Sequence, residues 1–209
     1  MEENKIMTIE QAEKQSKALA GSNVWTDKAA FEQLLRVANM LSQSNIVPAA
    51  YQGKPQDCFV ACELANRMNL SPVTVMQNLY VVKGKPSWSG SSCLALVENC
   101  GKYRNLQHVM VGEIGTSSWG CKLVGVRKSD GSVVEGTTVT MAMAQAEGWL
   151  GNVKWKSMPE QMLKYRAAAF FARAYCPEAL MGLQTSEEVE DSRRNAAKDL
   201  NNELNALED

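Results

Sequence analysis

The chain of 209 residues lacks the long apolar segments that would tie it to a membrane. No run approaches the roughly 18 consecutive apolar residues that a membrane-spanning helix needs. Its first residues, MEENKIMTIEQAEKQ, also lack the apolar core of a signal peptide. The sequence therefore predicts a cytoplasmic protein with no membrane partner.

The usual ingredients of an enzyme site are scarce as well. There is no GxxxxGK(S/T) motif, so the phosphate cradle of ATP-driven motors is missing. The single histidine, His108, has no zinc ligands at suitable spacing and is the sole imidazole for a catalytic relay. No closely spaced carboxylates resemble a two-metal site. We therefore expect no catalytic residue, no cofactor and no metal site.

Disulfide bonds are not expected either. None of the six cysteines belongs to a CxxC pair, and most fall in apolar or helical stretches. In a cytoplasmic protein this pattern favours reduced, structural side chains.

The net charge of −1 conceals an uneven distribution. Between residues 81 and 175 there are twelve basic and six acidic residues, whereas residues 186–209 hold eight acidic and three basic ones. A basic middle suits a phosphate-rich partner, and a surface that merely faces water is the alternative. Charge alone leaves both interpretations open.

Three helices are predicted in the first part of the chain. After Asp27, a capping residue, apolar residues recur at helical spacing up to about Ser44. A second helix is predicted over residues 56–68, with Asn69 suited to its C-terminal end. The Ser-Pro pair at 71–72 starts a short third helix.

Strands dominate the middle of the chain. The Asp130-Gly131 pair predicts a hairpin turn, because both residues can adopt a positive φ. The elements predicted here are a strand at 79–82, a turn at 83–86, a helix at 89–100 capped by Gly101, strands at 119–128 and 133–139, and a short helical segment at 140–147.

The most regular helix is predicted over residues 158–175, after a loop rich in Trp, Gly and Lys at 148–156. Prolines mark both ends of this helix. At about 100° per residue, Arg166 and Arg173 fall within about 20° of each other on one flank of its apolar stripe, and Lys164 lies on the other flank.

This order of elements predicts an α+β fold, in which an antiparallel β-meander packs against a long helix after a helical N-terminal segment. We expect a polar N-terminal arm over residues 1–26 and a core domain over residues 27–191. Residues 192–209 form an acidic C-terminal tail, which is either marginally helical or disordered.

Basic residues alternate with aromatic ones in several places. Cations neutralise phosphates whatever the base sequence, and aromatic rings can stack on bases. Packing in the core is the favoured alternative for each ring, because buried aromatic side chains are common. The candidate DNA-binding residues are Lys83, Lys85, Trp88, Lys102, Tyr103, Arg104, Lys154, Trp155, Lys156, Lys164, Arg166 and Arg173.

Three blocks of sequence carry a family resemblance. They are ACELANRMNLSPVTVMQNLYVVKGKPSWSG (61–90), LALVENCGKYRN (94–105) and WKSMPEQMLKYRAAAFFARAYCPEALMGLQTSEEVED (155–191). The last is the most specific, since a W-x-x-x-P-x-x-M helix leads to an aromatic residue, a proline and an acidic EE pair. Over residues 59–191 the chain resembles the phage single-strand annealing proteins of the RecT/Redβ type.

This resemblance implies ATP-independent, sequence-nonspecific binding of single-stranded DNA and annealing of complementary strands in phage recombination. It also implies a curved groove of meander and helix, similar to the eukaryotic strand-annealing mediators. The cations of residues 83–104 would form one wall of this groove and those of residues 154–173 the other. Magnesium is expected at most to modulate annealing.

The resemblance further implies that protomers associate head to tail, in a ring or a helical filament. The implied partners are single-stranded DNA, annealed duplex DNA, a phage exonuclease and the single-strand binding protein of a bacterial host cell. Two other functions stay open. One is a protective single-stranded DNA-binding protein without annealing activity, and the other is a non-DNA interaction module whose basic centre pairs with its own acidic tail.

Overall fold

The computed structural model describes residues 23–82 and 84–205. They form two compact units, of which the first ends at Gln77 and the second begins at Asn78. Most of the predicted arm at 1–26 lies outside the described residues, as does Lys83. The predicted domain boundaries at residues 26 and 191 stay predictions.

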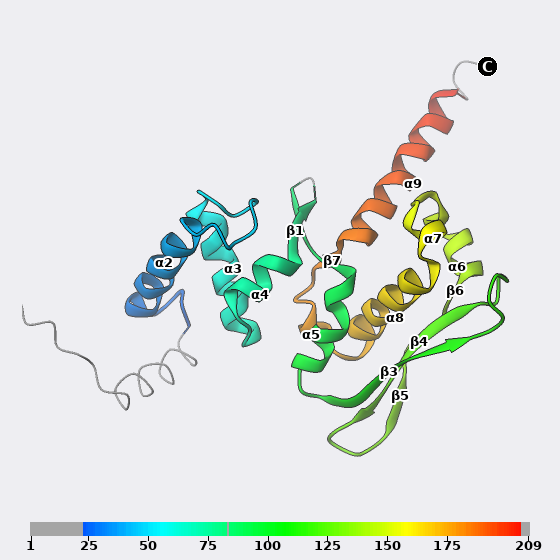
Figure 1. The fold of residues 1–209 in the computed structure, drawn as a ribbon, viewed down its shortest axis with the longest axis horizontal. Helices are drawn as coiled ribbons and strands as arrows, with labels where there is room; N and C mark the ends of the chain where they lie inside the picture. Colours follow the sequence, from blue (N-terminus) through cyan, green and yellow to red (C-terminus); the bar gives the residue numbers. More distant parts are fainter. Residues whose placement is uncertain (1–22, 83, 206–209) are drawn as a thin grey trace, which may run out of the picture. The chain divides into compact units, whose positions relative to one another are not determined.

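The helices α2 (Lys28–Ser42) and α3 (Pro55–Met68) belong to the first unit, and α4 (Pro72–Asn78) follows them (Figure 1). Asp27 caps α2, since its Oδ1 accepts hydrogen bonds from the backbone N–H groups of Ala29 and Ala30 at 2.9 and 3.2 Å. Asn69 ends α3 in the left-handed conformation, with φ of 52°. The three predicted helices are confirmed.

The second unit is a mixture of strands and helices. In chain order its elements are β1 (Leu79–Val82), β2 (Lys85–Trp88), the 3-10 helix η1 (Gly90–Ser92), α5 (Cys93–Asn99), β3 (Tyr103–Val111), β4 (Gly120–Arg127), β5 (Val133–Glu135), β6 (Val139–Thr140), α6 (Met141–Ala146), η2 (Trp149–Gly151), α7 (Lys154–Ser157), α8 (Pro159–Tyr175), η3 (Pro177–Ala179), β7 (Gln184–Thr185) and α9 (Ser186–Asn205).

The larger sheet of this unit is antiparallel, with strand order β3-β4-β5 and β6 paired to β4. The long helix α8 packs against β4 and so covers one face of the sheet (Figure 1). On β4, the residues that face α8 include Cys121 and Leu123, both fully buried. This arrangement confirms the predicted α+β class with a meander against a long helix.

A smaller sheet has the strand order β1-β2-β7. The β1–β2 hairpin is antiparallel, whereas β2 and β7 run parallel, with Trp88 opposite Thr185. The β7 strand has only two residues, and it joins segments nearly a hundred residues apart in the sequence. Sequence analysis did not predict it.

The core beneath the larger sheet is built from tryptophans and alanines. Trp119, Trp149 and Trp155 are buried there, and Trp149 stacks on Trp155 with ring centroids 5.5 Å apart. Buried alanines of α8 present little bulk, and Ala167 belongs to the same cluster. The helix can therefore approach the sheet and these large rings closely.

The hairpin between β4 and β5 differs in detail from the prediction. Gly131 has φ of +73°, but it is the only residue of the Asp130-Gly131 pair with a positive φ. Asp130 acts through its carboxylate instead: Oδ1 accepts hydrogen bonds from the N–H and the hydroxyl of Ser132, and Oδ2 accepts one from Arg127.

One predicted irregular segment proves to be helical, since the supposed loop at 148–156 contains η2 and most of α7. For the C-terminal tail, the helical one of the two predicted alternatives holds, because most of α9 lies there. In Figure 1, α9 begins beside α8 and then projects away from the rest of its unit. Its first turns are held by buried ion pairs, which no local sequence pattern reveals.

Candidate nucleic-acid interface

A groove runs along α8 between two sets of elements. It consists of a pocket of about 610 Å3, bordered by β1, α7, α8 and the start of α9, and a pocket of about 290 Å3, bordered by α5, β3 and α8. Ser91 and Tyr165 line both pockets, so the two are adjacent. We call this feature the α8 groove; it is lined by Val82, Ser91, His108, Lys154, Lys164 and Tyr165, among others.

Two lysines line the α8 groove, and a third lies on the neighbouring β1–β2 hairpin. Lys154 and Lys164 line it directly. Lys85 lies opposite Val82, a lining residue, in the β1–β2 register and therefore shares a face of the hairpin with it. Within the described part of the chain, Lys85 and Lys154 have no ion-pair partner, and Lys164 contacts Glu160 at 2.6 Å. An exposed pair of this kind contributes about 0–1 kcal/mol, so a phosphate can replace the carboxylate.

Two carboxylates at the start of α9 also border the groove. Glu187 is buried, and its Oε2 accepts hydrogen bonds from Gly90 N and Ser186 Oγ, both at 3.0 Å. A Cβ atom at Gly90 would lie only 2.8 Å from that oxygen, so this approach requires glycine. Glu190 lies 3.9 Å from Arg194. The hydrogen bonds stabilise the Glu187 carboxylate, and Arg194 partly offsets the charge of Glu190.

The structure separates Lys154 from Lys156. Because residues 154–157 form a helical turn, the two side chains point about 200° apart. Lys156 accordingly lines a different pocket, together with Trp119 and Leu150. The loop expected from the sequence would have allowed both lysines to face one groove.

Lys102 and Arg104 lie elsewhere too. Lys102 lines a third pocket beside Tyr175, the last residue of α8, and Arg104 is exposed near the start of β3. The 17 residues of α8 span about 25 Å, so these cations and Lys154 lie near opposite ends of the helix. The structure therefore does not place Lys102 and Arg104 on a wall opposite Lys154, as the sequence had predicted.

The three candidate aromatic residues are buried. Trp88 donates its indole N–H to Leu180 O at 3.1 Å, and Tyr103 donates its hydroxyl to Tyr175 O at 3.1 Å. Trp155 is 1% exposed in the tryptophan cluster. None of the three presents a ring face to a nucleobase, and we do not carry them into the proposal. Tyr80, half exposed on β1, and Tyr165 line the groove instead.

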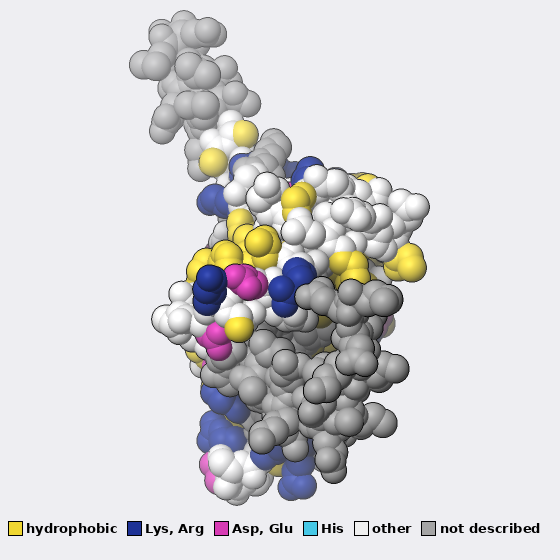
Figure 2. Space-filling model, turned by 90° about the vertical axis from the view of Figure 1, so that its left-hand side faces the viewer, with side chains coloured by type: hydrophobic (Ala, Val, Ile, Leu, Met, Phe, Trp, Pro, Cys, Tyr) yellow, Lys and Arg dark blue, Asp and Glu magenta, His cyan; other side chains and the backbone are white. Residues whose placement is uncertain are grey.

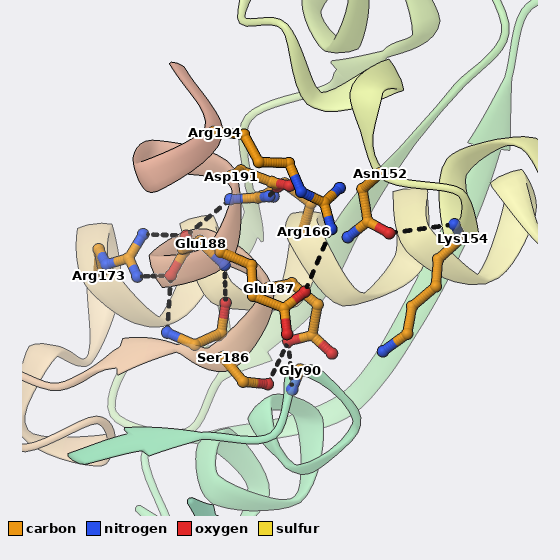
Figure 3. Close-up of polar contacts among 12 residues, drawn as sticks. Gly90, Asn152, Lys154, Arg166, Arg173, Ser186, Glu187, Glu188, Asp191 and Arg194 are labelled. Carbon is orange, nitrogen blue, oxygen red and sulfur yellow. Dashed lines mark hydrogen bonds and ion pairs between the residues drawn. The ribbon is translucent and has the colours of Figure 1, made fainter. Parts of the chain in front are cut away.

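Arg166 and Arg173 take part in a cluster of ion pairs between α8 and α9 (Figure 3). Arg166 is buried; its guanidinium pairs with Asp191 and with Glu188, and lies 4.1 Å from the centre of the Trp149 ring. Arg173 forms a bidentate pair with Glu188. We call these four charged residues the α8–α9 clasp. A phosphate could reach Arg166 only if the clasp opened.

Glu188 has a second role in the clasp. Its Oε2 accepts a hydrogen bond from Thr185 N at 2.9 Å, and Thr185 Oγ1 accepts one from Glu188 N at 3.3 Å. This reciprocal arrangement is a capping box, and the T-x-x-E pattern at residues 185–188 was the sequence signal for it. Sequence analysis noted the acidic pair but missed this cap.

The clasp and the groove shift the pKa values of their members. Burial raises the pKa of Asp191 above its ordinary value, against the opposing effect of Arg166. Burial also acts to raise the pKa of Glu188, but hydrogen bonds and charge from Arg173 lower it overall. In the groove, burial lowers the pKa of His108, whose Nε2 lies 3.1 Å from Lys164 O. A neutral imidazole is therefore favoured there.

The chain is thus an α+β protein whose long helix borders a groove lined by both lysines and carboxylates. The sequence model of the RecT family matches residues 32–200, and the chain belongs to this family. The resemblance found in the sequence is thus confirmed. No curated protein and no solved structure shows a significant match to the chain, and the likeness to the eukaryotic mediators stays a prediction.

Membership in the RecT family places the chain among the single-strand annealing proteins of DNA recombination, which are annealing proteins rather than catalytic enzymes. It also implies single-stranded DNA binding and self-association. Across the described residues, no helix is long and apolar enough to cross a lipid bilayer.

Proposed function

We propose that the chain holds single-stranded DNA in the α8 groove by its phosphates and anneals it to a complementary strand without ATP. The observation that carries this proposal is a pair of adjacent pockets along α8, one lined by Lys154 and the other by Lys164, with Lys85 on the neighbouring β1–β2 hairpin. Contacts of this kind are independent of base sequence.

Annealing requires that the bases of the bound strand stay accessible, and contacts to the phosphates leave them so. Cations that grip the backbone reduce the repulsion between two strands and keep the first one extended. A matched strand then gains roughly 1.4 kcal/mol of stacking for each base-pair step, whereas a mismatched strand gains less and dissociates. Base pairing supplies the selectivity, and the protein supplies order and charge neutralisation.

The test is a triple variant, Lys85→Ala/Lys154→Ala/Lys164→Ala, with Lys54→Ala as a matched control. Lys54 is exposed in the first unit, outside the groove. Fluorescence anisotropy with labelled oligothymidine should show the slope of log affinity against log salt shallower by about 2 in the triple variant, since each lost single-strand contact contributes about 0.7. An unchanged slope would remove the α8 groove from DNA binding.

A purely protective single-strand binder would have the same groove and the opposite effect on pairing. A fluorescence annealing assay separates the two functions, because the proposed protein accelerates pairing of complementary oligonucleotides and a protective one slows it. The assay is run without ATP, so acceleration also tests ATP independence.

Self-association in a ring or filament extends the proposal, as do contacts with a phage exonuclease and a host single-strand binding protein. A head-to-tail interface repeats the groove from one protomer to the next, which would give a long strand a continuous path. Electron microscopy with complementary oligonucleotides added in succession tests this assembly; monomers alone would contradict it.

A further inference from the structure

A second basic pocket lies at the C-terminal end of α8. It has a volume of about 640 Å3. We call it the Tyr175 pocket; it is lined by Lys102, Tyr103, Arg127, Lys128, Ser129 and Tyr175, with Gly101 and Ala174. Figure 2 shows Lys and Arg side chains gathered at the lower end of the molecule, where the β4–β5 hairpin lies in Figure 1.

The backbone brings two lysines of this pocket together. Lys128 N donates to Lys102 O at 2.9 Å, so the two residues are neighbours in the main chain of the pocket rim. The hydroxyl of Tyr175 donates to Glu135 O at 3.0 Å, and this bond anchors a ring that is 37% exposed. Lysine ammonium groups, the Ser129 hydroxyl and an anchored aromatic ring are together suited to a nucleotide's phosphate and base.

Two of the three cations that line the Tyr175 pocket, Lys102 and Lys128, are available to an added anion, whereas Arg127 pairs with Asp130 at 3.1 Å. Lys128 is exposed and has no ion-pair partner in the described ranges. Lys102 pairs with Glu178 at 2.5 Å, but both side chains are about half exposed. Exposed pairs of this kind contribute little, so a phosphate can replace Glu178 at small cost.

The Tyr175 pocket is separate from the α8 groove. It shares no lining residue with either groove pocket among the residues that the structure describes. The helix α5 lies between them: Leu94 near its start lines the groove, and Gly101 beyond its end lines the Tyr175 pocket. No Lys or Arg occurs in α5, and Glu98 on it is exposed. A single strand passing from one site to the other would meet that carboxylate.

We infer that the Tyr175 pocket holds phosphates of the incoming complementary strand while the α8 groove holds the first strand. This inference rests on the proposed function. Annealing brings two polyanions together, and cations on a second surface reduce their repulsion without competing for the first strand. The pocket is thus a capture site for the second strand.

The test compares Lys102→Ala/Lys128→Ala, Lys128→Glu and the control Lys54→Ala. Anisotropy gives the affinity for labelled oligothymidine, and energy transfer gives the annealing rate of two complementary oligonucleotides on protein already saturated with the first. Both pocket variants should bind oligothymidine within about twofold of the wild type and anneal about tenfold more slowly at low salt. The control should match the wild type in both assays.

Three results would overturn this assignment. Annealing at the wild-type rate would show that the pocket captures no second strand. A loss of oligothymidine affinity as large as in the groove triple variant would place the pocket on the first strand's path. Tighter binding of a labelled octaglutamate peptide than of oligothymidine, abolished in Lys102→Ala/Lys128→Ala, would assign the pocket to an acidic peptide. Failure of the proposed function can be distinguished from failure of this inference, because the groove triple variant would then keep the wild-type salt slope.

Discussion

At the scale of single residues, Arg166 illustrates how a basic side chain can lie inside the fold. Two carboxylates and the face of Trp149 surround its guanidinium, and only 6% of the residue is exposed. A buried charge is stable only when paired charges offset its desolvation cost, and the same holds for the carboxylates that pair with it. Its main contribution is therefore to the stability of the α8–α9 contact.

Replacing Arg166 should accordingly destabilise the protein. In Arg166→Ala, Asp191 and Glu188 stay buried with less compensation, and we expect a loss of about 3–5 kcal/mol in the free energy of unfolding. Arg173→Ala is the matched comparison and should cost less, because the Arg173 side chain is 39% exposed. Urea titration followed by circular dichroism measures both. A loss below about 1 kcal/mol in Arg166→Ala, with a shallower DNA salt slope, would return Arg166 to the DNA site.

His108 should make stability depend on pH below the ordinary histidine pKa of 6.5. Burial lowers its pKa from the ordinary value of 6.5, so in this range the unfolded chain binds more protons than the folded one. Stability therefore falls as the pH drops through the unfolded pKa towards the lower folded one.

The measurement is the free energy of unfolding of the wild type and His108→Gln across this range. Because the chain has one histidine, the variant should show a flatter profile. Asp191, whose pKa is raised, shifts stability in the opposite direction, so the difference between the two proteins isolates the imidazole. Parallel profiles would contradict the inferred shift.

At the scale of elements, the β4–β5 turn depends on one glycine. Gly131 has φ of +73°, and a Cβ there would meet no neighbouring atom within 4 Å, so backbone strain alone decides the effect. Gly131→Ala should cost about 1–2 kcal/mol. Gly151→Ala is the control, since Gly151 also has open space around it but no positive φ. Equal thermal unfolding midpoints for the two variants would contradict this account.

Sequence patterns located the long elements well and the short ones poorly. Helices α2, α3 and α8 span several turns, so their apolar periodicity and caps are readable. By contrast, η2 and α7 have three and four residues, too few for a period to emerge. The pairing of β7 depends on β2, a tertiary partner that local sequence does not reveal.

At the scale of the whole molecule, the sequence supplied the kinds of residues in the site but not their positions. Most of the predicted lysines and arginines divide among the groove, the Tyr175 pocket, the clasp and the far side of α7, and Arg104 is exposed near the start of β3. The order of charged residues along the chain does not tell where their side chains point, because that direction depends on helical phase and strand register. Lys154 and Lys156 show this directly, since about half a turn of helix separates them and their side chains point about 200° apart.

Deleting residues 192–209 tests whether the acidic end masks the basic centre. The acids that pair with α8, Glu188 and Asp191, precede the deletion and would remain. Affinity for oligothymidine should therefore be unchanged or higher than in the full chain, because only the distal charge is removed. Anisotropy at low salt measures it. Loss of all DNA binding, in a truncated chain that circular dichroism shows to be folded, would instead support a module that pairs with its own tail.

The parallel pairing of β2 with β7 has a consequence during synthesis. The β1–β2 hairpin emerges from the ribosome early, yet the edge of β2 stays without its neighbour until residues 184–185 have been made. An uncovered strand edge is a template for foreign strands. Nascent chains that stall before residue 184 should therefore be prone to aggregation and depend on chaperones, while release of the completed chain closes that edge and ends the exposure.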